Sequence, residues 1–269
     1  MKRVGIIGYG AIARSIIADL RAHPVRKHEL AAVLTRPSKE EEARAALPGT
    51  TLVTRNLHSF LDAGLDIVIE AAGQQAVRDL AVSVLERSRE LQILSAGALA
   101  DAQLRSDVEE AAESHCARVT IPAGAMAGFR GLLALRHAGL KSVTYTSTKP
   151  PAAWRGTPAE NTFALDRIDA AVELFSGNAR QAALQFPKNA NLAAVVALAG
   201  LGFEHTRVRL IADPTTEYNS GHINARSDVG DLDVTLSGPA SGGNLKTSEV
   251  TAWSVIAALH NSVETLAFA

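Results

Sequence analysis

A glycine pair near the start of the chain constrains the fold more than any other feature. Gly8 and Gly10 follow the apolar run 4–7 and precede a segment with helical periodicity, 11–21. A tight turn from a strand into a helix needs the first glycine, and the second lets a pyrophosphate approach the backbone. The free N–H groups and the positive dipole end of the helix then face the phosphates. The predicted dinucleotide contacts in this βαβ unit are Gly8, Gly10, Ala11 and Ile12.

The rest of the N-terminal part alternates between short apolar runs and helical segments. Continuous apolar runs without alternation are typical of parallel strands covered on both faces. The pattern predicts an α/β fold whose residues 1–125 form a Rossmann domain, a doubly wound parallel sheet. The further runs are 30–34, 67–69, 93–94 and 119–121, and the helical segments between them include 75–87 and 101–115.

The pattern changes after about residue 140. Residues 141–149 alternate and are rich in β-branched side chains, which is typical of an antiparallel strand. We expect residues 126–245 to form a second, α+β domain with a mixed or antiparallel sheet. A final apolar helix, about 246–269, is expected to pack back on the first domain. The other expected elements are a loop at 152–165, a helical region at 168–200 and strands at 206–211, 218–225 and 232–237.

The choice of cofactor depends on the end of the second strand. An acidic residue there would accept a hydrogen bond from the ribose 2′-hydroxyl of NAD. Residues 34–38 contain no carboxylate, and Arg36 is placed to pair with a 2′-phosphate. We therefore expect NADP or NAD, with NADP favoured. Ala72 follows a later strand, where a small residue leaves room for the nicotinamide half, and is a further predicted contact.

Composition excludes several classes of function. The net charge of −1 argues against a nucleic-acid or anionic-membrane partner, since both need a clustered basic surface. The single cysteine, Cys116, has no metal-ligand spacing around it, so no metal site and a reducing, cytoplasmic location are expected. No apolar run has the roughly 18 residues that a membrane span requires.

The further marked segments are 121–128, 149–151 with Trp154, 186–191, 212–214, 219–222 and 246–248. Together with the glycine turn, these segments resemble the L-aspartate dehydrogenase family over nearly the whole chain. The resemblance implies reversible conversion of L-aspartate and NAD(P)+ to oxaloacetate and ammonia through iminoaspartate, and often a homodimer. It implies that His222 is the catalytic residue and that Ala125 and Asn191 contact the cofactor. The chain has Ala-Gly-Ala-Met-Ala where the family often has Ser-Gly-Ala-Ile-Gly, and Ala13 where Gly is common.

The chemistry of this reaction agrees with these residues. An amine dehydrogenase moves protons and activates water, and histidine titrates near neutrality. The two carboxylates of aspartate need cationic or amide donors, or the free N–H groups at the start of a helix. The substrate-binding candidates are Lys188, Asn189, Thr247 and Ser248, the last two at the expected start of the final helix.

Other functions stay open on the sequence alone. A homoserine dehydrogenase or dihydrodipicolinate reductase shares this two-domain plan, and a non-catalytic dinucleotide sensor would keep the glycine turn. A lone histidine such as His222 is commonly structural. A relaxed specificity for amines also stays open, because a few side chains of the substrate pocket decide it.

Overall fold

The computed structural model describes residues 1–22, 28–241 and 244–267. By their contacts the residues divide into two compact units. The first unit joins two separated stretches of chain, Met1–Pro122 and Ala252–Ala269, and the second is Ala123–Thr251. Within the described residues, no helix combines the length and the apolar character that crossing a bilayer requires.

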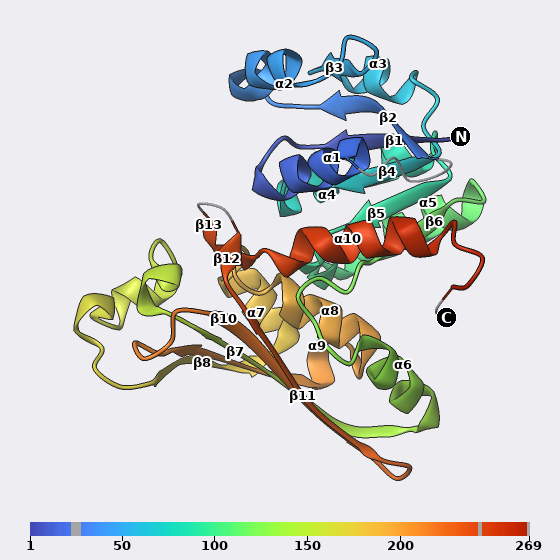
Figure 1. Cartoon of the computed structure of the whole chain (residues 1–269). Helices are drawn as coiled ribbons and strands as arrows, with labels where there is room; N and C mark the ends of the chain where they lie inside the picture. Colours follow the sequence, from blue (N-terminus) through green and yellow to red (C-terminus); the bar gives the residue numbers. More distant parts are fainter. Residues whose placement is uncertain (23–27, 242–243, 268–269) are drawn as a thin grey trace. The chain divides into compact units, whose positions relative to one another are not determined.

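A six-stranded parallel sheet forms the centre of the first unit. Its strand order is β3-β2-β1-β4-β5-β6, and Figure 1 shows the strands in this order from top to bottom. The order of progression reverses between β1 and β4, which is the topological switch point of a doubly wound sheet. The predicted fold class is confirmed. The strands are β1 (Lys2–Ile7), β2 (His28–Leu34), β3 (Leu52–Thr54), β4 (Ile67–Glu70), β5 (Glu90–Ile93) and β6 (Arg118–Thr120).

Helices cover both faces of this sheet. Ile16 of α1 and Val255 of α10 share one buried cluster with Ile6 of β1. On the other face Phe60 of α3 packs so closely on β1 that a Cβ added to Gly5 would lie 2.7 Å from its ring. The helices are α1 (Ala11–Ala22), α2 (Glu40–Ala46), α3 (Leu57–Leu61), α4 (Gln74–Leu85), α5 (Ala102–Ser114) and α10 (Val250–Asn261), with short 3-10 helices η1 (Pro37–Lys39) and η2 (Ala96–Ala100).

Side-chain caps fix where several helices begin. The Asp101 carboxylate accepts hydrogen bonds from the N–H groups of Gln103 and Leu104, at 3.0 and 3.2 Å, and α5 starts at the next residue. In the second unit, Asn178 and Gln181 form a reciprocal capping box at the start of the helix that follows. Such caps satisfy N–H groups that have no partner within the helix.

One strand and two helices of the first unit were not predicted from the sequence. β3 has 3 residues, α2 has 7 and α3 has 5. Elements this short span too few residues for a periodic pattern to be recognised. The sequence-predicted helices at 11–21, 75–87 and 101–115 correspond to α1, α4 and α5.

A mixed five-stranded sheet forms the second unit, in the order β11-β10-β7-β9-β8. β7 pairs antiparallel with β10 and parallel with β9, so the predicted mixed sheet is confirmed. The strands are β7 (Leu140–Lys149), β8 (Val172–Asn178), β9 (Thr206–Ala212), β10 (Asn219–Ser227) and β11 (Asp231–Gly238).

The two faces of this sheet differ in character. Figure 1 shows the helices of the second unit gathered on one side of the sheet. A Cβ added to Gly200, directly after α8, would lie 3.3 Å from Val143, so these helices pack on the face that carries Val143. The apolar face also carries Tyr145, Val208, Leu210 and Ile223, and the polar face carries Thr144, Thr146, Arg209, His222 and Asn224. The helices are α6 (Phe129–Ala138), α7 (Ala179–Gln185), α8 (Asn191–Ala199) and α9 (Gly202–His205), and the 3-10 helices are η3 (Pro151–Trp154), η4 (Pro158–Asn161) and η5 (Leu165–Arg167).

The prediction of a helical region from residue 168 was wrong over its first part. Residues 172–178 form β8, which pairs antiparallel with β9 at the edge of the sheet. The pairing decides the conformation, because residues of β8 on both sides of a bulge at Leu174 pair with β9. The remainder of the region, α7 and α8, is helical as expected.

The prediction of a helix from residue 247 was also wrong at its start. Thr247 and Ser248 lie in the strand β13 (Asn244–Ser248), which pairs antiparallel with β12 (Ala240–Ser241), and α10 begins only at Val250. The helix ends at Asn261, before the expected end. Residues 268–269 of the predicted segment lie outside the described residues. Strand pairing therefore replaces the free helix N-terminus that was expected at these two residues.

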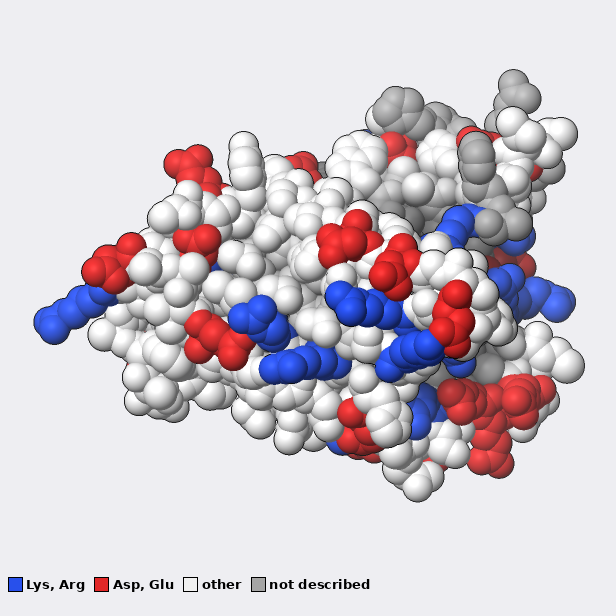
Figure 2. Space-filling model, turned by 90° about the horizontal axis from the view of Figure 1, so that it is seen from below, with Lys and Arg blue, Asp and Glu red and all other residues white. Residues whose placement is uncertain are grey.

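Charged side chains of both signs lie interspersed over the face shown in Figure 2. The ion pair between Arg209 and Glu173, at 2.5 Å, links β9 to β8 in the second unit. Arg180 and Glu204 form another pair in the same unit. Pairing of this kind divides the surface charge into small neutral groups.

Candidate functional site

The turn between β1 and α1 has the geometry that a phosphate-binding loop needs. Gly8 has φ +106°, and a Cβ there would lie 2.7 Å from the carbonyl oxygen of Ala71. A side chain at this position would therefore strain the backbone and clash with β4. A Cβ at Gly10 would meet nothing within 4 Å, so the backbone at this position faces open space.

A pocket of about 700 Å³ opens around this turn. It is built from the carboxyl ends of β1, β2, β3 and β4, where ligands of doubly wound sheets bind. Of the predicted contacts, Gly8, Gly10, Arg36 and Ala72 line it, whereas Ala11 and Ile12 lie in the adjoining first turn of α1. The lining residues are Ile7, Gly8, Tyr9, Gly10, Leu34, Thr35, Arg36, Pro37, Lys39, Arg55, Leu57, Ala71, Ala72, Ala76, Asp79 and Leu80.

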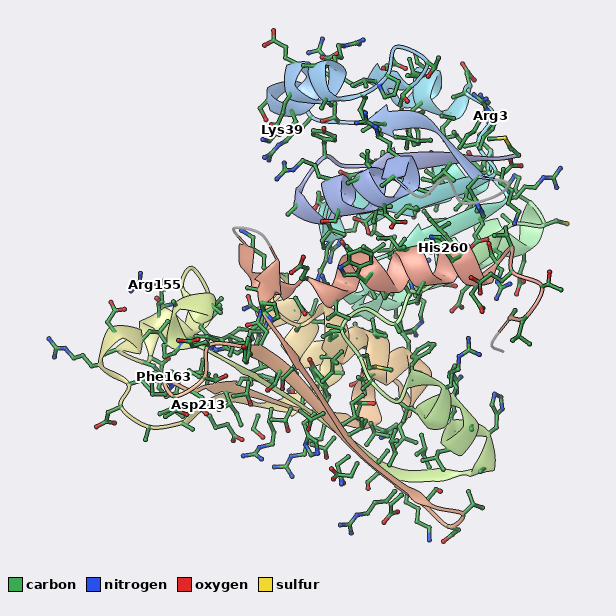
Figure 3. All side chains as sticks on the ribbon, viewed as in Figure 1. Arg3, Lys39, Arg155, Phe163, Asp213 and His260 are labelled. Atoms are coloured by element: carbon green, nitrogen blue, oxygen red, sulfur yellow. The ribbon has the colours of Figure 1, made fainter. Side chains whose placement is uncertain are left out.

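Three cationic side chains line the part of the pocket next to β2 and β3. Lys39 pairs with Glu42, and Arg55 pairs with Glu40 at 2.7 Å. The hydrogen bond from Lys39 holds the pKa of Glu42 below its usual range. Arg36 is exposed and forms no ion pair within the described part of the chain. Figure 3 shows Lys39 on the side of the sheet where the strands end, and Arg3, from the start of β1, on the opposite side.

A buried carboxyl group lies at the end of β4. Glu70 is 1% exposed and accepts four hydrogen bonds, two from the N–H groups of Ala72 and Gly73 and two from Ser95. Burial raises the pKa of this carboxyl, and the hydrogen bonds oppose that effect. The neighbouring Ala72 is exposed on the wall of the pocket.

In the second unit, the predicted contacts Ala125 and Asn191 lie in adjacent segments. Ala125 is buried in the loop that follows β6, and Asn191 is the first residue of α8. A Cβ added to Gly124 would lie 2.9 Å from Leu192, which places this loop against the first turn of α8.

The 3-10 helix η3 joins several segments of the second unit. The Asn189 carboxamide donates to the carbonyl oxygen of Ala153 at 3.0 Å, and the Trp154 ring meets the edge of Phe186 at a centroid distance of 6.2 Å. The strand β13, which holds Thr247 and Ser248, also contacts η3. Two buried polar atoms here, Asn189 Oδ1 and Trp154 Nε1, have no hydrogen-bond partner among the described residues.

Two lysines near η3 differ in burial. The sequence-predicted Lys188 is exposed. Lys149, at the end of β7, is 6% exposed, and its ammonium group lies 5.5 Å from the centroid of the Trp154 ring. Since side chains alternate along a strand, Lys149 lies on the same face as Tyr145. Burial raises the pKa of Tyr145 to about 12.

His222 lies in the middle of β10 rather than in a polar loop. Its Nε2 is 2.9 Å from Asp233 Oδ1, and Asn224 donates to the other oxygen of the same carboxylate at 2.7 Å. The hydrogen bond from His222, followed by that from Asn224, lowers the pKa of Asp233. This cluster occupies the polar face of the sheet, whereas Lys149 occupies the apolar face. The structure therefore does not bring His222 together with Lys149.

Sequence reasoning missed Asp233, Lys149, Lys39 and Arg55. Counting outward from the turn at 228–230 places Asp233 opposite Asn224, so the hairpin register was a usable signal. The alternation along β7 would have placed Lys149 on the buried face. Arg55 follows β3, and because this strand was not predicted, no sequence pattern placed Arg55 beside the cofactor pocket.

Comparisons with known proteins cover both halves of the chain. The family model "Aspartate dehydrogenase, C-terminal" matches residues 131–262, and "Homoserine dehydrogenase, NAD binding domain" matches residues 8–122. The chain is 40% identical over 265 residues to the L-aspartate dehydrogenase of Ralstonia nicotianae, covering 97% of each chain. The chain belongs to the L-aspartate dehydrogenase family. Another member, from Serratia proteamaculans, is 37% identical over 264 residues, covering 98% of each chain.

Solved structures share the fold of this family member. The aspartate dehydrogenase of Thermotoga maritima superposes with a TM-score of 0.77 at 23% identity, covering 100% of both chains. A dihydrodipicolinate reductase from Paenisporosarcina gives a TM-score of 0.52 at 14% identity. The first resemblance spans both units, and the second is weaker over a similar share of the chain, 97%. The family expected from the sequence is confirmed.

Proposed function

We propose that this chain catalyses the reversible, NAD(P)-dependent oxidative deamination of L-aspartate to oxaloacetate and ammonia through iminoaspartate. One observation carries the proposal, the match of residues 131–262 to the aspartate dehydrogenase C-terminal model. This stretch includes most of the second unit, outside the dinucleotide pocket. The match to a homoserine dehydrogenase model covers the NAD-binding half alone, and so does not favour homoserine as the substrate.

The pocket around the glycine turn is our proposed cofactor site. The open space at Gly10 accommodates a pyrophosphate, and the first turn of α1, with Ala11 and Ile12, offers its N–H groups. Ala72 lines the pocket beyond the switch point, and Ala125 and Asn191 are proposed contacts from the second unit. When bound, the nicotinamide accepts the hydride from aspartate or returns it to the imine. The protein's share is to hold the substrate and to move protons.

NADP is the favoured cofactor in this proposal. Arg36, Lys39 and Arg55 line the part of the pocket beside β2, where the adenosine ribose of a doubly wound fold lies. No carboxylate is present at residues 34–38 to accept the 2′-hydroxyl of NAD. A 2′-phosphate adds negative charge that suits these three cations.

For the substrate we propose the residues around η3, with Lys149 facing a carboxylate and Asn189 facing the amine. Lys149 is a buried cation, and Asn189 has an unsatisfied carboxamide oxygen that can accept from an amine or ammonia. Thr247 and Ser248 stay proposed substrate-binding residues, because their strand β13 contacts η3. A substrate contact from Lys188 stays a prediction. Its ammonium group is exposed to water, where attraction to a carboxylate is weaker than it is for a buried ammonium group.

A catalytic role for His222 stays a prediction. Asp233 would orient the ring through its hydrogen bond, as a carboxylate does in a catalytic triad. The opposite faces occupied by His222 and Lys149 argue against both acting on one substrate within a subunit.

The proposal keeps the expected homodimer. Light scattering on the purified protein at several concentrations tests it, and a monomer mass at all of them would exclude a stable dimer.

The decisive test of the function is nicotinamide absorbance with purified protein, oxaloacetate and ammonium, with NADPH and NADH in separate assays. We expect loss of absorbance that requires both oxaloacetate and ammonium. Loss without ammonium would indicate ketone reduction instead. No loss with either cofactor would exclude the proposed activity.

A further inference from the structure

Glu70 is a buried carboxyl group that the proposed reaction does not use. It ends β4 and is 1% exposed. Placing an acidic group where water cannot reach it carries a large desolvation cost unless hydrogen bonds compensate. The surroundings of Glu70 supply those hydrogen bonds, which points to a specific task for the carboxylate.

The carboxylate connects two separate loops. Oε1 accepts from the N–H groups of Ala72 and Gly73, both at 2.8 Å, and from the Ser95 hydroxyl at 3.0 Å. Oε2 accepts from the N–H of Ser95 at 3.0 Å. Ala72 and Gly73 lie in the loop between β4 and α4, and Ser95 lies in the two-residue link between β5 and η2. One side chain therefore fixes the loops after two neighbouring strands.

These loops lie on one side of the switch point between β1 and β4. In doubly wound folds, one half of the dinucleotide lies over the strands on each side of that point. The cations Arg36 and Lys39 follow β2 on one side, which assigns that side to the adenosine half. The loops held by Glu70 follow β4 and β5 on the other side, and Ala72 lines the pocket there.

We propose that Glu70 is a positioning residue that holds the loops after β4 and β5 in the shape that receives the nicotinamide half of the cofactor. The inference rests on the cofactor site of the proposed function and not on the identity of the substrate. Glu70 itself is buried beneath Ala72 and Gly73, so it acts through their backbone rather than by touching the cofactor.

Two ligands separate this role from a general structural one. NADPH contains both halves of the cofactor, whereas 2′,5′-ADP contains only the adenosine half. Calorimetry measures both dissociation constants for the wild type and for Glu70→Gln and Glu70→Ala. Gln keeps an oxygen for three of the donors but presents an NH2 group to the Ser95 N–H. Ala removes all four hydrogen bonds.

We expect Glu70→Gln to weaken NADPH binding about tenfold, and Glu70→Ala more strongly, because each lost charged hydrogen bond loosens a loop. Binding of 2′,5′-ADP should change by less than about twofold, a factor well below the effect of one such bond. Glu90→Gln is the matched control, because Glu90 begins β5 and so lies at the end of that strand away from Ser95 and the pocket. It should leave both dissociation constants unchanged.

Equal weakening of both ligands by Glu70→Gln would show a merely structural role and overturn the inference, as would unchanged binding of both. If Glu70→Ala does not fold, Glu70→Gln and Ser95→Ala still decide the question. A wild type that binds NADPH but does not aminate oxaloacetate would refute the proposed activity alone. A wild type that binds no nicotinamide cofactor would overturn both.

Discussion

Replacement of Arg36 by alanine tests directly whether the pocket prefers NADP to NAD. The side chain lines the dinucleotide pocket beside β2, and it has no ion-pair partner within the described part of the chain. Its full charge is therefore available to a ligand. Lys39 and Arg55 are already paired with Glu42 and Glu40, so each offers less net charge to a phosphate.

The magnitude follows from the chemistry of the ligand. A ribose 2′-phosphate carries about −1.5 to −2 charges at neutral pH, and a hydrogen bond to a charged group contributes about 1.5–3 kcal/mol. Arg36 is exposed, so solvent screening places its contribution at the lower end. We expect Arg36→Ala to weaken NADPH about tenfold, since about 1.4 kcal/mol corresponds to that factor. Lys39→Ala should weaken NADPH less, because Lys39 already donates a hydrogen bond to Glu42 and would give it up to reach the phosphate.

Equilibrium titration of the quenching of protein fluorescence by NADPH and NADH measures the effect. Binding of NADH to Arg36→Ala should stay within about twofold of the wild type, because the lost hydrogen bond exists only with the phosphate. The NADPH preference should also shrink with added salt, which screens exposed charges. Arg89→Ala removes the same charge next to the start of β5, at the opposite ends of the strands from the pocket, and serves as the control. Equal weakening of both cofactors by Arg36→Ala would refute the 2′-phosphate contact.

Three further predictions concern the second unit and the buried histidine of β2. Lys149→Met should raise the KM for oxaloacetate at least tenfold, a factor that corresponds to about one charged hydrogen bond. Lys188→Met should leave this KM unchanged. Equal effects of the two substitutions in steady-state assays would remove Lys149 from the substrate site. If His222 is the proton carrier, His222→Ala should lower kcat by about 100-fold or more at unchanged NADPH affinity; a kcat within a few-fold of wild type excludes it. Burial lowers the pKa of His28 below 6.5. The unfolded chain then binds the extra proton, so stability is full above pH 6.5 and falls with acidification. His28→Phe should flatten the dependence of Tm on pH between about 7 and 5, the range where an unperturbed histidine titrates. An unchanged slope of Tm against pH would show that other groups cause the loss of stability in acid.

The sequence was most informative where the structure is locally determined. The glycine turn, the buried parallel strands and the longer helices of the first unit each leave a periodic or positional signal, and α1, α4 and α5 lie where predicted. β8 was mistaken for a helix because its conformation depends on pairing with β9, about 30 residues later along the chain, and not on its own pattern. The same reason explains Thr247 and Ser248, which lie in a strand paired with β12 rather than at the start of a helix.

The site was predicted less completely than the fold. Residues that meet a ligand through their own backbone, such as Gly8 and Gly10, follow from local sequence. The pairing of His222 with Asp233 depends on the register of two strands, and the burial of Lys149 depends on which face the helices cover. Neither property belongs to a single segment, so the resemblance to the family supplied His222 without showing which face it occupies.

The return of α10 to the first unit has a consequence for how the protein is made. Ala252, Val255, Ile256 and Leu259 complete the cluster around α1 and β1, although more than half of the chain separates them from these elements. A ribosome releases the whole second unit before it releases these residues. All residues of the second unit are therefore synthesised before α10, and during that time the apolar face of the nascent first unit stays uncovered. Such a face is a binding site for chaperones until the last helix arrives, and a chain that stops before Ala252 would keep it uncovered.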